Sequence, residues 1–165
     1  FSTVAVPNPH LISFVDHKTI KGPLLKELAT YLNGTNPYFP DGVNVSFVEE
    51  LGNQKIFVRT FERGVGFTNA CGTAMAASSL MYVLLKGGKL EEKIQVTNPG
   101  GMVQTIVHQK EDGNYWMDLI GNATFLNKVF ISLEDILNHQ LTNGEVILLN
   151  EDKTYHEFIE GLSTI

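Results

Sequence analysis

The stretch that decides the fold is ACGTAMAASSLMYVLLKGG, which covers residues 70–88. It has no charged side chain from Ala70 to Leu85, and small residues dominate its first half. Lys86 and the two glycines after it are typical of a helix end, because a cation suits the last turn and glycine adopts left-handed backbone. A helix that is apolar on every side must be buried on every side. The stretch therefore predicts a central helix wrapped by a sheet. Its uncharged part, Ala70 to Leu85, is shorter than the run of about 18 apolar residues that a membrane span needs.

Alternating apolar residues on both sides of this helix predict strands. The expected strands are 2–6, 11–16, 43–48, 55–61, 93–97, 102–108, 115–121 and 124–131. Helical spacing predicts a helix over 24–32, whereas Pro7 to His10 is expected to form an unpaired turn and 62–69 a loop. The fold class is α+β, with a curved mixed or antiparallel sheet around the apolar helix.

At Leu133 the succession of expected strands gives way to short mixed elements, which indicates a second part of the chain. Short helices are expected over 133–141 and 155–162, with a strand over 145–149 between them. We therefore expect a domain over 1–132 and a C-terminal extension over 133–165 that packs on or beside it.

The composition excludes several kinds of partner and site. The 165 residues carry a net charge of -6, so the charge does not favour binding to nucleic acid or to an anionic membrane. No secretory signal is visible, so a cytoplasmic location is expected. The single cysteine, Cys71, excludes an internal disulfide and a cysteine-based zinc cluster. The five histidines lack short ligand spacing, so no metal site is expected.

Cys71 lies where the central helix should begin. Unpaired amides and the helix dipole there favour negative charge, which predicts a thiol of lowered pKa. Gly72 allows close approach to the backbone, and the amides of Gly72 and Thr73 would bind a carboxylate. This combination indicates chemistry at a carbon next to a carboxylate. The alternative is a thiol that merely packs in the core.

Other polar residues are candidates for the same site. Arg63, directly after Glu62, is suited to bind a carboxylate with two hydrogen bonds, but the pair could equally be a surface ion pair. His10 is either a general acid/base or a histidine that stabilises a turn. Asn8 and Asn44 are candidate hydrogen-bond donors, although asparagine in turns often bonds its own backbone.

Five motifs together resemble a known family. They are Asn8-Pro9-His10, Val43-Asn44-Val45, Glu62-Arg63-Gly64-Val65-Gly66, Ala70-Cys71-Gly72-Thr73 and Pro99-Gly100-Gly101. Their order and spacing are similar to those of the C-terminal half of diaminopimelate epimerase, from about Val4 to Phe130. The resemblance implies a pyridoxal-free isomerase of lysine biosynthesis, without a cofactor, that interconverts LL- and meso-diaminopimelate. It also implies two α+β domains, each a curved sheet around a central helix, with the active site between them.

The resemblance also implies roles for individual residues. Two cysteines face the substrate's α-carbon from opposite sides, and Cys71 corresponds to the second, with Glu62 and His10 as auxiliary acid/base groups. Arg63, Asn8 and Asn44 would bind the distal end of diaminopimelate, and the amides of Gly72 and Thr73 its reacting carboxylate. This sequence departs from the family at Phe67, usually glutamate, and at Ala74, usually glycine.

The N-terminal domain with the first cysteine is absent from these residues, so the isolated chain is expected to be inactive. Its expected partners are diaminopimelate and that N-terminal domain, with a homodimer as a candidate assembly. Three alternatives stay open: a thiol hydrolase or acyltransferase using Cys71 with His10 as base, a racemase of the same fold acting on another amino acid, and an inactive ligand-binding module.

Overall fold

A computed structural model describes residues 1–162, so residues 163–165 of the expected extension lie outside the described part. The chain divides into two compact units, one from Phe1 to Gly121 and one that starts at Asn122. This division falls earlier than the boundary expected after residue 132. No helix within the described residues is long and apolar enough to cross a membrane.

The first unit is a sheet with three helices. Its strands are β1 (Ser2–Val6), β2 (Asn8–Phe14), β3 (Asn44–Gly52), β4 (Lys55–Glu62), β5 (Gly66–Thr68), β6 (Lys93–Asn98), β7 (Gly101–Gln109) and β8 (Tyr115–Ile120). Its helices are α1 (His17–Lys21), α2 (Leu24–Leu32) and α3 (Gly72–Lys86). The strand order is β1-β2-β3-β4-β6-β7-β8, with β5 paired to β4. The β2–β3 and β4–β6 pairs are parallel and the other pairs antiparallel, so the sheet is mixed.

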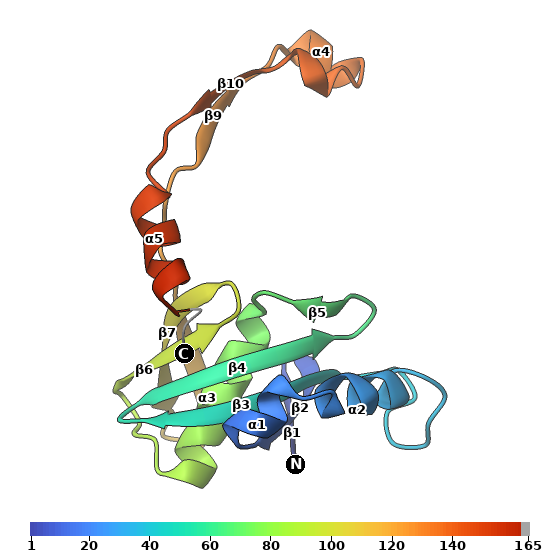
Figure 1. Cartoon of the computed structure of the whole chain (residues 1–165), viewed down its shortest axis with the longest axis vertical. Helices are drawn as coiled ribbons and strands as arrows, with labels where there is room; N and C mark the ends of the chain where they lie inside the picture. The colour runs from blue at the N-terminus through green and yellow to red at the C-terminus, as the bar shows by residue number, and fades with distance from the viewer. Residues whose placement is uncertain (163–165) are drawn as a thin grey trace. The chain divides into compact units, whose positions relative to one another are not determined.

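The sheet curls around α3, which contacts β1, β2, β3, β4, β6, β7 and β8. Helices α1 and α2 lie on the opposite side of β3 from α3 (Figure 1). Alternation along the strands separates two cores. On β4, Ile56 and Val58 pack in the core around α3, whereas Phe57 and Phe61 pack in the core under α1 and α2. The predicted fold class, a curved mixed sheet around a central apolar helix, is confirmed.

Helix α3 begins directly after Cys71, as expected, but it is not buried along its whole length. Cys71 is its N-cap residue, and Gly72 is its first helical residue. Every residue from Ala74 to Tyr82 is buried, but Leu84 and Leu85 are 45% and 57% exposed, because the last turn extends beyond the core cluster. The expected stop is confirmed: Gly87 has a φ of 80°, and the Gly88 amide donates to the Tyr82 carbonyl over 3.3 Å.

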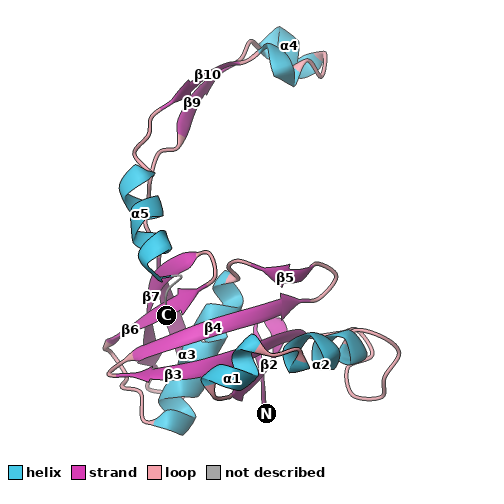
Figure 2. Ribbon diagram, in the orientation of Figure 1, coloured by secondary structure: helices cyan, strands magenta, loops and turns pink. Residues whose placement is uncertain are grey.

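Two segments expected to be irregular are strands. Asn8 to His10 pair with Val4 to Val6 in a tight β1–β2 hairpin, so the predicted unpaired turn is wrong. Pro9 is tolerated there because the ladder to β3 begins only at His10, and no donor is needed from residue 9 on that side. The loop predicted over 62–69 contains β5, which Figure 2 shows as a short strand beside the end of β4.

The second unit consists of short elements. They are β9 (Asn127–Phe130), α4 (Leu133–Leu137), a 3-10 turn η1 (Leu141–Asn143), β10 (Glu145–Leu148) and α5 (Lys153–Leu162). The strand expected over 124–131 is shorter and pairs with β10. The helix expected over 133–141 ends at Leu137, because Asn138 caps it and His139 has a φ of 57°, which breaks helical backbone.

Candidate active site

Three polar residues form a row across neighbouring strands on the α3 side of the sheet. His10 on β2 is paired with Asn44 on β3. The β3–β4 ladder pairs Val45 with Phe61, which places Glu62 beside Asn44. His10 shares its face with Ile12, and Glu62 shares its face with Val58, both of which pack around α3. The row therefore faces α3, although its members are far apart in the sequence.

Cys71 lies at the N-terminal end of α3. Its backbone is extended, with a φ of -137°, and its half-buried sulfur is 3.6 Å from Thr73 Oγ1. Burial raises the pKa of the thiol; bonds from Thr73 and the Ala74 backbone oppose this, and the Glu62 carboxylate adds to it. The expected lowering of the pKa is therefore wrong for this chain. Desolvation of the thiolate outweighs the stabilisation that the helix N-terminus offers it.

Glu62 links the two other titratable groups. Its carboxylate raises the pKa of both Cys71 and His10, in each case against or beside a larger effect of burial. The Thr68 hydroxyl donates to Glu62 Oε1 over 2.5 Å. His10 is 1% exposed, and neither ring nitrogen has a hydrogen-bond partner within the described residues. Burial lowers the pKa of His10 while Glu62 opposes this, so His10 is biased towards the neutral imidazole.

Arg63 and Asn44 are joined through the backbone. Asn44 Oδ1 accepts a hydrogen bond from the Arg63 amide over 2.9 Å, which leaves the NH₂ group of Asn44 as the part able to donate to a ligand. The exposed Arg63 guanidinium donates from Nη1 to the Asp41 carbonyl over 2.8 Å. Gly42 is required beside it: its φ is 74°, and a Cβ there would lie 2.9 Å from Arg63 Cδ. Asn8 is exposed and lies two residues from His10 on the same face of β2.

The backbone before α3 is held by the turn between β6 and β7. The Gly100 amide donates to the Asn69 carbonyl and to Asn98 Oδ1, each over 2.9 Å. A Cβ on Gly100 would lie 3.0 Å from Asn69, so the close approach favours glycine. A Cβ on Gly72 would lie 3.0 Å from a methyl group of Leu119. The hydrogen bond to the Asn69 carbonyl therefore ties the segment just before Cys71 to the β6–β7 turn.

The structure thus brings Glu62 into interaction with both Cys71 and His10, and places Asn44 between His10 and Glu62. Within residues 1–162 no hydrogen bond joins Cys71 directly to His10. In the same part of the chain no three His, Cys, Asp or Glu side chains are grouped to hold a metal ion. Sequence reasoning missed Thr68 and the Asp41 carbonyl. Thr68 could have been found as the first hydroxyl residue after the glycines that follow Glu62.

Comparison with known proteins assigns the family. The sequence model described as "Diaminopimelate epimerase" matches residues 2–126. The chain belongs to this family. Two curated relatives are the diaminopimelate epimerases of Enterococcus faecalis, 58% identical over 163 residues, and of Ligilactobacillus salivarius, 62% identical over 165 residues. The matches cover 99% and 98% of this chain but 50% and 51% of the relatives, so the chain spans about half their length.

Solved structures share the fold of this family member. A phenazine biosynthesis protein of the PhzF family from Bacillus anthracis aligns with a TM-score of 0.51 and 21% identity, over 80% of this chain and 40% of that one. A predicted epimerase from Pseudomonas aeruginosa aligns with a TM-score of 0.50 and 14% identity, over 68% of this chain and 36% of that one. These likenesses show the fold alone.

Phe67 and Ala74, where the resemblance implies a departure from the family, both lie in regular elements. Phe67 lies on β5 with its ring 5.3 Å from that of Phe61, in an edge-to-face arrangement, and 4.5 Å from the guanidinium carbon of Arg59. Ala74 is fully buried in the first turns of α3. Neither side chain is among the groups that act on Cys71 or His10.

Proposed function

We propose that this chain is the C-terminal half of a diaminopimelate epimerase and that Cys71 is one of its two acid/base thiols. The observation that carries the proposal is the row of His10, Asn44 and Glu62 on the side of the sheet that faces α3, with Cys71 at the N-terminal end of that helix. Family membership supplies the reaction class, and this arrangement supplies groups able to take up and release a proton.

Inversion at a carbon requires that a proton leave one face and another arrive on the opposite face. In one direction, the Cys71 S–H bond breaks as a C–H bond forms at the α-carbon, and Cys71 is left as a thiolate. A second thiolate, from the other half of the enzyme, removes the original α-proton from the opposite face. The two sulfurs exchange protonation states, so the reaction balances without an external acid or base. The raised pKa of Cys71 suits it to begin as the proton donor.

The remaining site residues bind the substrate in this proposal. The amides of Gly72 and Thr73, at the N-terminal end of α3, hold the carboxylate beside the reacting carbon and stabilise the charge that develops there without an imine cofactor. Arg63 binds the distal carboxylate, which distinguishes diaminopimelate from ordinary amino acids. Asn8 and the NH₂ group of Asn44 bind the same distal end.

The test compares the full-length enzyme, its Cys71→Ala variant and this chain alone. Exchange of the α-proton of diaminopimelate in D₂O is followed by NMR. The full-length enzyme is expected to exchange, whereas Cys71→Ala loses about 10³-fold or more in rate, because one face has no proton relay. The isolated chain is expected to show no exchange. Exchange by the isolated chain at the rate of a whole enzyme would refute the two-thiol assignment.

Substrate choice is tested at Arg63. In the full-length enzyme, Arg63→Ala is expected to raise KM for diaminopimelate about 10- to 100-fold, the usual value of a charge-assisted pair. Arg63→Lys retains the charge and should lose less. If an amino acid without a distal carboxylate reacts as fast as diaminopimelate in the unsubstituted enzyme, the racemase alternative is correct instead.

A further inference from the structure

Strand β5 lies beside the candidate site, and its side chains point to both faces of the sheet. It has three residues, and the register pairs Thr68 with Thr60 and Phe67 with Phe61. Thr60 lies in the same alternation as Val58 and Glu62, on the α3 side, whereas Phe61 packs in the core under α1 and α2. Thr68 and Phe67 therefore point to opposite sides of the sheet.

On the α3 side, Thr68 holds Glu62. Its hydroxyl donates to Glu62 Oε1 over 2.5 Å, a short charge-assisted hydrogen bond. Glu62 ends β4 and is only half-buried, so its carboxylate has room to turn towards solvent. The bond from Thr68 fixes one of its two oxygens and so determines how the carboxylate is presented to Cys71.

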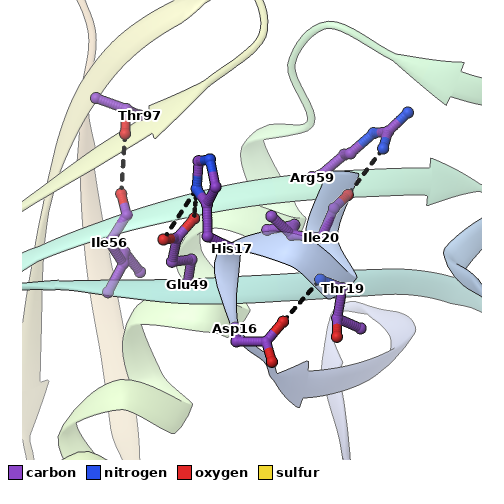
Figure 3. Close-up of polar contacts among 8 residues, drawn as sticks. All are labelled: Asp16, His17, Thr19, Ile20, Glu49, Ile56, Arg59 and Thr97. Carbon is purple, nitrogen blue, oxygen red and sulfur yellow. Dashed lines mark hydrogen bonds and ion pairs between the residues drawn. The ribbon is translucent and has the colours of Figure 1, made fainter. Parts of the chain in front are cut away.

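On the opposite side, Phe67 anchors the strand. Its ring packs edge-to-face on Phe61 and against the guanidinium of Arg59, which reaches it diagonally across the ladder. Arg59 is itself fixed, because Nη1 donates to the Ile20 carbonyl at the end of α1 over 2.8 Å (Figure 3). A chain of contacts thus runs from α1 through Arg59 to Phe67 and the backbone of β5.

We propose that β5 is a two-sided positioning element: Thr68 orients the Glu62 carboxylate towards Cys71, and Phe67, held by Arg59 and Phe61, fixes the strand that carries Thr68. The titratable groups that act on one another here are His10 from β2, Glu62 from β4 and Cys71 before α3. The inference takes Glu62 as a site residue, as in the proposed function, but its test does not require epimerase activity.

The test uses Cys71 as its own reporter, because it is the only cysteine in the chain. The rate of alkylation by iodoacetamide is measured against pH, and its midpoint reports the pKa of Cys71. Glu62 raises that pKa, so Glu62→Gln is expected to lower the midpoint. Thr68→Val, which keeps the shape and removes the hydroxyl, should lower it by about 0.5, or about a threefold higher rate at a fixed pH below the midpoint. Thr68→Ser should restore the original midpoint.

Thr3→Val is the matched control, because it removes an exposed strand hydroxyl on β1. An unchanged or higher midpoint in Thr68→Val, or an unchanged one in Glu62→Gln, overturns the proposal whether or not the enzyme is an epimerase. In the full-length enzyme, Thr68→Val is expected to lower kcat about tenfold with little change in KM, because it misplaces a proton-transfer group rather than a binding group.

The anchor is tested by Phe67→Ala and Phe67→Glu. Phe67→Ala removes the ring contacts and should lower the midpoint in the same direction as Thr68→Val. Phe67→Glu supplies a carboxylate to Arg59 from the same diagonal position and should keep the original midpoint, whereas the double variant with Arg59→Met should lose it. If Phe67→Ala keeps the original midpoint, Phe67 has no positioning role.

Discussion

The two units of the chain differ in what they bury. The first, from Phe1 to Gly121, has two clusters of buried apolar side chains, one around α3 and one under α1 and α2. The second, from Asn122 onward, is equally rich in large apolar residues, yet none of those described is buried. Phe125, Leu133 and Leu137 are each about 70% exposed.

The two units differ in how their helices and strands are layered, not in how rich they are in large apolar residues. In the first unit each face of the sheet has a helix to pack against, so alternating side chains are buried on both sides. In the second, β9 and β10 form a two-stranded ribbon, and such a ribbon has little independent stability. We therefore expect the stability of the chain, and with it the geometry of the site, to depend on the first unit.

The largest expected effect is that of Phe47→Ala in the first unit, compared with Phe130→Ala in the second. Phe47 is 1% exposed under α1 and α2. Phe47→Ala should lower the free energy of unfolding by about 3–5 kcal/mol, because the change leaves a cavity. Phe130→Ala in β9, where the ring is 59% exposed, should cost less than about 0.5 kcal/mol. Urea denaturation followed by circular dichroism measures both. Equal losses would mean that the second unit contributes a core of its own.

The secondary-structure elements of both units could largely be predicted from the sequence, but which of them are buried could not. Alternation in 43–48 and 55–61 indicated strands with an apolar face, and the uncharged stretch from Ala70 indicated the central helix. The same kind of pattern predicted elements after Leu133, but a pattern of apolar residues does not say whether a second layer covers them. Strand β5 was missed because a three-residue strand that begins at Gly66 is too short to show alternation; only pairing with β4 makes it a strand.

The residues of the candidate site could be predicted from the sequence better than their burial and their hydrogen-bond partners. Cys71, Glu62 and His10 were all candidates, and the register brings Glu62 and His10 to one face. The direction of the Cys71 pKa was predicted wrongly, because local sequence shows a helix N-terminus but not how far the folded chain buries the thiol. Thr68 was missed for a similar reason: its role depends on the β4–β5 pairing.

A smaller effect is expected inside the core around α3. The Thr105 hydroxyl donates to Ser79 Oγ over 2.6 Å, and Ser79 donates to the Met75 carbonyl over 2.9 Å. Thr105→Val removes one member of this buried pair and should cost about 1–3 kcal/mol, because the Ser79 oxygen loses its donor. Thr105→Ser keeps the hydroxyl and should recover most of the loss. If valine is as stable as threonine, the hydroxyl pair contributes nothing to this core.

Two histidines of the first unit should give opposite pH dependences. His10 is buried, and burial lowers its pKa below 6.5 despite Glu62, so the unfolded state binds the proton more readily. Its contribution is present above pH 6.5 and is lost as the pH falls through the lowered folded value. For His108, desolvation lowers the pKa, but hydrogen bonds and charge from Glu91 and Asp118 outweigh it and the net pKa is raised. Its contribution is present below pH 6.5 and is lost as the pH rises through the raised value.

Urea midpoints between pH 5 and 8 separate the two histidines. Compared with the original chain, His10→Asn should flatten the loss of stability on the acid side, and His108→Gln should flatten the loss on the alkaline side. His108 bridges Glu91 and Asp118 and stacks on Trp116 with ring centroids 3.9 Å apart, so its substitution also tests that surface cluster. Identical pH profiles for the two variants would contradict both assignments.

The smallest expected effect is that of Leu85→Ala in α3, and its comparison with Leu80→Ala refines the distinction between apolar sequence and covered surface. Leu80 is buried against the sheet, whereas Leu85 is in the last turn and 57% exposed, although both belong to the same uncharged stretch. Leu80→Ala should cost about 2–5 kcal/mol, but Leu85→Ala should change the unfolding free energy by less than about 0.5 kcal/mol, because alanine's helix propensity offsets the little area lost. If Leu85→Ala costs as much as Leu80→Ala, the last turn is covered after all, and the stretch is buried on every side as its sequence predicts.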